Sequence, residues 1–133
     1  MAQLSHTDKH PLTGAERYEM LRNFAIEENL KNIEFIPLPH DCYLTTWVAF
    51  IETICPPFDA VYARNPQMRA LFRENGYALV EPLFERKISG TVVRAAIATN
   101  GKWQGYVPQA VARFLKEKNL VQRIQEVSLD ENI

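Results

Sequence analysis

The sequence predicts an α/β fold in which helices cover both faces of a parallel sheet. Segments with apolar residues at helical spacing alternate with short apolar segments that are typical of buried strands. This alternation favours a parallel sheet, because each parallel crossover normally contains a helix. Only three strands are predicted beside five helices, and none precedes the first helix, so the fold is short of sheet at its N-terminal end.

Length and composition predict one domain over residues 1–133. Of the 133 residues, 47% are hydrophobic and 23% are charged, which excludes a disordered chain. We expect the polar stretch 128–133 to be a frayed tail. Because the net charge is only −1, we expect no nucleic-acid partner. Because no apolar run is long enough to cross a bilayer, we expect no membrane partner either. Two cysteines make no disulfide framework, so we expect a cytoplasmic protein.

A capping box predicts where the first helix begins. The Thr13 hydroxyl is placed to accept from the third helical amide, and the Glu16 carboxylate to accept from the Thr13 amide. Apolar residues then recur at helical spacing, and we expect the helix to end near Asn29. Residues 33–36 alternate apolar and polar side chains before a proline, which predicts a short strand.

The middle of the chain predicts two helices around a second strand. Residues 47–54 form an apolar helical stripe that ends before two prolines. Residues 60–63 are apolar and are bounded by prolines, so they predict a buried strand. Asn65 follows as an N-cap with Pro66 at the first helical position, and this helix is expected to end at Gly76.

The last third of the chain predicts one more strand and two helices. Residues 77–80 are apolar and predict the third strand. Ser89 caps a helix that we expect to end at residues 100–101, an Asn-Gly pair. Pro108 opens the final helix.

Residues 88–94, with the sequence ISGTVVR, are typical of an anion-binding helix N-terminus. Ser89 as N-cap and Gly90 beside it leave backbone amides at the positive end of a helix open to a ligand. Arg94 lies about one turn further on, where its guanidinium can bind two phosphate oxygens. A plain capped helix with a surface arginine fits the same spacing.

Four other residues have both a structural and a binding interpretation. Trp47 packs in a core by default, but its indole is also a flat platform for a base. His40, Asp41 and Asn65 follow predicted strands, and ligands bind at the carboxyl ends of strands in open α/β sheets. Asn65 also fits a plain helix cap, and a lone Asp such as Asp41 in a proline-rich loop is more often a turn former than a catalyst. The histidines are too scattered for a zinc site, so we expect no metal site built by the protein.

Four stretches of the sequence also match a known pattern. They are AQLSH at residues 2–6, LTGAER at 12–17, PPFDAVYARNP at 56–66 and ISGTVVR at 88–94. In this order, with Trp47 between the second and third, they resemble the archaeal nicotinamide-mononucleotide adenylyltransferases of the nucleotidyltransferase superfamily. The serine–arginine motif alone is common to the superfamily, whereas its combination with the stretch at 56–66 is much more specific.

The resemblance implies a Rossmann-like nucleotidyltransferase fold and an activity. Members of the family transfer the adenylyl group of ATP to nicotinamide mononucleotide, giving NAD and pyrophosphate, with Mg²⁺. The family is typically oligomeric, so we expect a homo-oligomer. Arg94 is the implied catalytic residue, since it would meet the charge that grows on the pyrophosphate. The implied ATP-phosphate binding residues are Ser89, Gly90, Thr91, Arg94 and Lys9, the last of which stands where some relatives have arginine.

The resemblance also implies a site for the nicotinamide nucleotide. Trp47 would stack on the nicotinamide ring, and Asn65 would lie in the same cleft. His40 and Asp41 would lie near the nicotinamide end. His40 and Leu44 stand where the family usually has Asp and Asn, so they are the positions on which the identity of the acceptor depends.

A second departure from the family concerns the start of the chain. The family opens with a strand and a loop carrying a His-x-Gly-His motif, followed by a helix, and this spacing does not occur in the sequence. We therefore expect the N-terminal βα portion to be missing and turnover by the chain as given to be impaired. Two alternatives stay open: a non-catalytic nucleotide-binding remnant, and an adenylyltransferase for another phosphorylated acceptor, such as a flavin or pantetheine phosphate.

Overall fold

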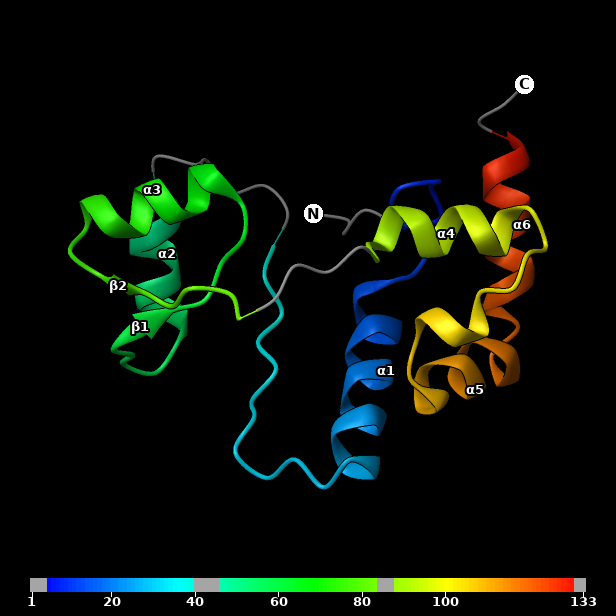
Figure 1. The fold of residues 1–133 in the computed structure, drawn as a ribbon, viewed down its shortest axis with the longest axis horizontal. Helices are drawn as coiled ribbons and strands as arrows, with labels where there is room; N and C mark the ends of the chain where they lie inside the picture. The colour runs from blue at the N-terminus through cyan, green and yellow to red at the C-terminus, as the bar shows by residue number, and fades with distance from the viewer. Residues whose placement is uncertain (1–4, 40–45, 84–87, 131–133) are drawn as a thin grey trace. The chain divides into compact units, whose positions relative to one another are not determined.

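A computed structural model describes residues 5–39, 46–83 and 88–130. The chain divides into two compact units. Unit 1 consists of Met1–Pro37 and Lys87–Ile133, and unit 2 of Leu38–Arg86. Figure 1 shows the helices of unit 1 and the small sheet of unit 2. The single domain expected over residues 1–133 stays a prediction.

Unit 2 contains a parallel two-stranded sheet, which confirms the predicted α/β class. Strand β1 (Ala60–Val61) pairs with β2 (Ala78–Leu79), and Ala60 lies opposite Ala78. The ladder extends by one bond, since the Val80 amide donates to the Val61 carbonyl at 2.9 Å. Both strands fall within the predicted segments but are shorter. Coverage of the sheet by helices on both faces stays a prediction.

The described residues of unit 2 also form two α-helices (Figure 1): α2 (Trp47–Ile54) and α3 (Pro66–Glu74). α3 forms the crossover between the strands and contacts β2. Three aromatic rings form the centre of the unit. Phe58 stacks on Tyr77 at a centroid distance of 4.7 Å, and the buried Phe72 meets both rings edge-on. The Tyr77 hydroxyl also donates to the Glu52 carboxylate at 2.8 Å and so connects α2 to the start of β2.

Unit 1 contains four α-helices among its described residues: α1 (Gly14–Glu27), α4 (Gly90–Ala98), α5 (Gln109–Glu117) and α6 (Leu120–Asp130), with a short 3₁₀ turn, η2 (Gln104–Tyr106). α1 packs on α5 and α4 packs on α6 (Figure 1). Their apolar faces bury one cluster, in which Ile97 and Leu120 are the least exposed. The buried members of the cluster are Leu12, Ile97, Trp103, Ala112, Phe114, Leu115, Leu120 and Ile124.

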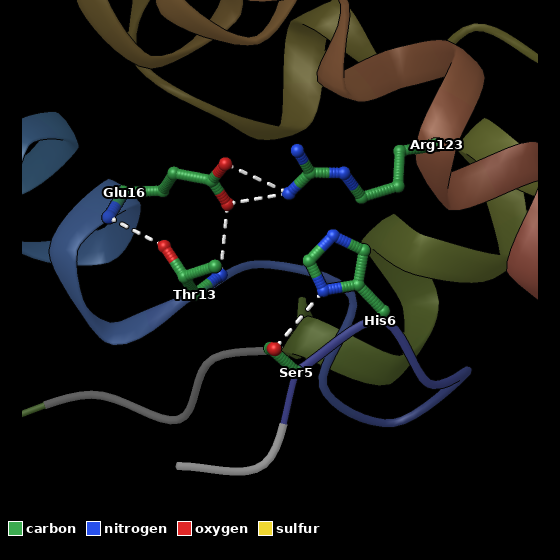
Figure 2. Close-up of polar contacts among 5 residues, drawn as sticks. All are labelled: Ser5, His6, Thr13, Glu16 and Arg123. Carbon is green, nitrogen blue, oxygen red and sulfur yellow. Dashed lines mark hydrogen bonds and ion pairs between the residues drawn. The ribbon is translucent and has the colours of Figure 1, made fainter. Parts of the chain in front are cut away.

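The predicted capping box at the start of α1 is confirmed, and an arginine from α6 extends it (Figure 2). The Glu16 amide donates to the Thr13 hydroxyl at 3.1 Å, and the Thr13 amide donates to the Glu16 carboxylate at 2.8 Å. Arg123 donates to the same carboxylate. Partial burial raises the pKa of Glu16, but the hydrogen bonds from Arg123 and Thr13, together with the Arg123 charge, outweigh burial and hold the pKa below its usual value of 4.5.

Two predicted elements differ from the structure. Residues 33–36 form no strand, and Ile33 and Ile36 are exposed. An alternating pattern makes a strand only where a neighbouring strand supplies hydrogen-bond partners, and none of the described residues pairs with this segment. The predicted final helix is two helices, because Asn119 takes a left-handed φ of 55° between α5 and α6. α6 runs through Asp130, past the expected start of the tail.

The helix ends follow a shared rule. Gly76 has a φ of +84°, as predicted for the end of α3. At the end of α4, however, the left-handed residue is Asn100 with a φ of 56°, and not the glycine after it. Asn29, after α1, has a φ of 54°. Asparagine tolerates the left-handed region better than other side chains, so it ends these helices where glycine is absent or displaced.

In the described residues, no helix is both long and apolar enough to cross a membrane.

Candidate functional site

The N-terminus of α4 has the geometry expected of an anion site. Ser89 is the N-cap, and its hydroxyl accepts from the Val92 amide at 3.3 Å. The amides of Gly90 and Thr91 stand ahead of the first helical acceptor, so the helix itself leaves them without partners. Ser89, Gly90 and Thr91 are all exposed. The helix therefore presents two open amides at the positive end of its dipole, an arrangement that favours an anion.

Arg94 lies over this first turn of α4. Its Nη2 is 3.4 Å from the Thr91 hydroxyl, and a methyl group added at Gly90 would lie 2.8 Å from its Nη1. The guanidinium thus occupies the space that the missing side chain of Gly90 leaves. Among the residues that the structure describes, Arg94 forms no ion pair with a carboxylate. Its charge is therefore available to an external anion.

Lys9 lies in the loop before α1. A main-chain turn shapes this loop, since the Thr7 amide donates to the His10 carbonyl at 3.2 Å and the His10 amide to the Thr7 hydroxyl at 3.1 Å. The Lys9 side chain is exposed and has no hydrogen bond or ion pair within the described part of the chain. Its proposed role in binding phosphate stays a prediction.

Trp47 is the first residue of α2 and is half-buried. Its ring stacks on Phe50 at a centroid distance of 6.2 Å with an angle of 27° between the planes. A ring that is supported on one side and partly exposed can serve as a stacking platform, although core packing explains the same contact. The fold thus leaves both interpretations of Trp47 in place.

Asn65 is the N-cap of α3, as predicted. Its side-chain oxygen accepts from the amides of Gln67 at 2.9 Å and Met68 at 3.2 Å. These bonds fix the orientation of the amide group and leave its two N–H groups as donors. Asn65 is exposed and lies just beyond β1, at the carboxyl end of that strand. A capping role and a ligand-binding role are therefore compatible.

The predicted residues are shared between the two units. Lys9, Ser89, Gly90, Thr91 and Arg94 belong to unit 1, whereas Trp47 and Asn65 belong to unit 2. His40, Asp41 and Leu44 lie outside the described residues. Within unit 1, Gly90, Thr91 and Arg94 meet on one helical turn.

One residue near the predicted nicotinamide end was missed. Arg69 of α3 donates to main-chain carbonyls that follow β1 and β2, and to the Glu81 carboxylate at 2.6 Å. Sequence pattern offers no signal for this contact, because Arg69 occupies an ordinary polar position of a helix and its partners lie up to 12 residues away. The contact becomes visible only when the strand ends are placed.

A small parallel α/β sheet and a serine-capped helix with an arginine on its first turn are features of nucleotidyltransferases. Comparison with known proteins specifies the family. The chain is 39% identical over 132 residues to the nicotinamide-nucleotide adenylyltransferase of Ignicoccus hospitalis, covering 96% of this chain and 77% of the relative. It is 39% identical to that of Thermococcus onnurineus over 93% of this chain and 68% of the relative, and 35% identical to that of Saccharolobus solfataricus over 95% and 76%.

The chain belongs to the nicotinamide-nucleotide adenylyltransferase family, whose members are nucleotidyltransferases. The resemblance inferred from the four sequence stretches is thereby confirmed. A scan against protein-family models finds no match. The relatives are longer than the matched region, and the match extends over nearly all of this chain.

Proposed function

We propose that this chain transfers the adenylyl group of ATP to nicotinamide mononucleotide, giving NAD and pyrophosphate. Relatives named nicotinamide-nucleotide adenylyltransferase match nearly the whole chain. The observation that supports the proposal apart from these relatives is the α4 N-terminus. Its open amides, and Arg94, which has no carboxylate partner in the described part of the chain, can bind a polyphosphate. The amides and Arg94 lie on residues 88–94, the segment whose serine–arginine motif resembles that of the nucleotidyltransferase superfamily.

The chemistry divides between two bond changes. A phosphate oxygen of nicotinamide mononucleotide attacks the α-phosphorus of ATP, and the bond from that phosphorus to the oxygen bridging the β-phosphorus breaks. Pyrophosphate leaves with the electron pair of that bond. The protein needs no covalent intermediate for such a displacement, so positioning and charge stabilisation supply most of the rate.

Each candidate residue has a defined role in the proposal. The Gly90 and Thr91 amides bind phosphate oxygens, with Ser89 holding the helix start in shape. Arg94 binds the β- and γ-phosphates and stabilises the charge that develops on pyrophosphate. Lys9 adds a second positive charge. In unit 2, Trp47 stacks on the nicotinamide ring and Asn65 donates to the same nucleotide, with His40 and Asp41 as further contacts.

Magnesium is proposed to arrive with the triphosphate. Among the described residues, no group of three or more His, Cys, Asp or Glu side chains is placed to hold a metal ion. Mg²⁺ commonly takes its ligands from substrate phosphates, water and one or two carboxylates, so the described residues fit an ion bound mainly by ATP. Bound in this way, it neutralises part of the triphosphate charge.

A homo-oligomer is also proposed. Unit 1 has a groove of about 430 Å³ along α1, lined in part by Tyr18, Ile26, Leu30 and Phe35. Ile26 is 66% exposed and Leu30 is 42% exposed. Exposed apolar residues that gather in one groove are typical of surfaces that bind another protein. Light scattering at several protein concentrations tests this proposal, and a monomer at every concentration contradicts it.

The function is tested by product analysis and by binding. Purified chain is incubated with ATP, MgCl₂ and nicotinamide mononucleotide, and NAD and pyrophosphate are quantified against an Arg94→Ala control. In parallel, calorimetry measures binding of ATP, nicotinamide mononucleotide, NAD, flavin mononucleotide and 4′-phosphopantetheine. We expect slow NAD formation, in keeping with the impaired turnover expected from the sequence, and we expect it to depend on both substrates and on Arg94.

Three results would count against this function. Adenylylation of the flavin or pantetheine phosphate in preference to nicotinamide mononucleotide assigns another acceptor. Binding of ATP and NAD with no turnover at any enzyme concentration indicates a non-catalytic nucleotide-binding protein. Failure to bind any of the five compounds excludes a nucleotide site altogether.

A further inference from the structure

Arg69 joins the carboxyl ends of both strands of the sheet. Its Nη1 donates to the Ala63 carbonyl at 2.9 Å and to the Val80 carbonyl at 3.3 Å, and its Nη2 donates to Glu81 at 2.6 Å. The Arg69 side chain is only 15% exposed, whereas that of Glu81 is 79% exposed. The guanidinium thus bridges the ends of the two strands by donating to two main-chain carbonyls and one carboxylate.

Asn65 lies between Ala63, whose carbonyl accepts from the Arg69 guanidinium, and the first turn of α3. It follows Ala63 by two residues, and its own carbonyl accepts from the Arg69 amide at 3.0 Å. Its side-chain oxygen is held by the amides of the first turn of α3. Main chain and side chain of Asn65 are therefore both constrained, and the Arg69 guanidinium holds the preceding turn at the Ala63 carbonyl.

We propose that Arg69 is a positioning residue for the acceptor nucleotide, acting through Asn65. By holding the Ala63 carbonyl, Arg69 fixes the turn that leads from β1 to Asn65 and so fixes where the Asn65 amide presents its N–H groups. This inference rests on the proposed function, because it needs Asn65 to bind the nicotinamide nucleotide. It assigns a role to a residue that does not itself touch the ligand.

The type of side chain supports a positioning role. A guanidinium is a planar fork that can serve two carbonyls and a carboxylate at once, whereas an ammonium group on a flexible stem is a single point of charge. Three of the four Nη–H groups of Arg69 already donate to protein acceptors, so most of the guanidinium is engaged in holding the strand ends. Ligand groups are held productively only when the supporting residues are themselves locked.

A purely structural role for Arg69 makes a different prediction. If the guanidinium only stabilises the sheet, its loss lowers the fraction of folded protein and reduces the binding of every ligand in proportion. A positioning role acts on one ligand and depends on Asn65. The two roles separate when ATP and nicotinamide mononucleotide affinities are compared in protein that circular dichroism shows to be folded.

The experiment uses Arg69→Met, Arg69→Lys and Asn65→Ala, each alone, and Arg69→Met combined with Asn65→Ala. Arg73→Met is the matched control, because Arg73 is exposed in the last turn of the same helix. Dissociation constants for nicotinamide mononucleotide and ATP are measured by calorimetry. We expect Arg69→Met to weaken binding of nicotinamide mononucleotide about tenfold, roughly the loss of one hydrogen bond.

Several results distinguish the possibilities. We expect ATP affinity within about twofold of the unaltered chain, partial recovery in Arg69→Lys, and no further loss when Arg69→Met is added to Asn65→Ala. Equal losses for both ligands, additive effects of the two substitutions, or unchanged affinity in Arg69→Met overturn this inference alone. Absence of binding of nicotinamide mononucleotide to the unaltered chain overturns the proposed function, and this inference with it.

Discussion

Arg123 on α6 donates through one nitrogen, Nη1, to both carboxylate oxygens of Glu16 on α1, at 2.8 and 2.6 Å. The two residues are 107 positions apart in the chain. Glu16 also closes the capping box, so one carboxylate joins the start of the first helix to the last helix (Figure 2). The side chains are 26% and 23% exposed, which places the pair between the surface and the core.

We predict that Arg123→Ala destabilises the protein by about 1–3 kcal/mol, because a charge-assisted hydrogen bond is lost and a partly buried carboxylate remains. Urea unfolding followed by circular dichroism measures the effect. Arg113→Ala is the matched control, since its pair with Glu27 is much more exposed, at 54% and 39%. Exposed pairs contribute about 0–1 kcal/mol. Equal losses in the two variants would contradict a special role for Arg123.

We predict that the stabilising effect of Glu16 disappears in acid. Its pKa is lowered in the folded state, so its contribution is fully present above the usual value of 4.5 and is lost as the pH falls through the folded value. Glu16→Gln keeps an acceptor for the Thr13 amide but removes the charge. We expect the difference in unfolding free energy between the two proteins to shrink below pH 4.5. A difference that stays constant from pH 7 to pH 3 would contradict this.

We predict that Arg94→Ala weakens ATP binding by about 10- to 100-fold, since hydrogen bonds to charged groups contribute about 1.5–3 kcal/mol each. Calorimetry in the presence of MgCl₂ measures the change. Arg22→Ala serves as the control because Arg22 is exposed on α1 and its substitution removes the same charge. If both variants bind ATP as the unaltered chain does, Arg94 has no part in the phosphate site.

We predict that Gly90→Ala weakens ATP binding without destabilising the protein. The added methyl group would lie 2.8 Å from Arg94 Nη1 and must displace the guanidinium, whereas α4 itself accepts alanine at its first position. Gly105→Ala is the control, since no heavy atom lies within 4 Å of a methyl group there. Lower ATP affinity with an unchanged or higher melting temperature is the expected result, and unchanged affinity is the contrary one.

We predict that Trp47→Ala weakens NAD binding by about two- to tenfold, the effect of losing one aromatic stacking contact. Trp47→Phe should recover part of the affinity, and ATP binding should change less. Tryptophan fluorescence gives a second readout, because the other tryptophan, Trp103, is 4% exposed in the core of unit 1. Quenching by NAD that persists in Trp47→Phe would contradict stacking on Trp47.

Features that depend on neighbours in the chain were predicted well. The capping box at Thr13, the Asn65 cap and the Ser89 cap are all present, and each needs partners no more than three residues away. The ISGTVVR stretch likewise identified the helix N-terminus that carries the candidate phosphate site, because a cap, a glycine and an arginine one turn later interact within that turn.

Tertiary structure alone decided the remaining features. Residues 33–36 have the alternation of a strand, but strand formation depends on a distant partner that pattern does not reveal. The Glu16–Arg123 pair and the Arg69 contacts join residues that become neighbours only after the helices and strand ends are placed. By itself the sequence determined where several helices begin and which family the chain belongs to, and it located the turn that we propose binds an anion. Folding decided which charges are paired, because the pairing of charges depends on contacts between distant parts of the chain; within the described ranges Arg94 has no carboxylate partner.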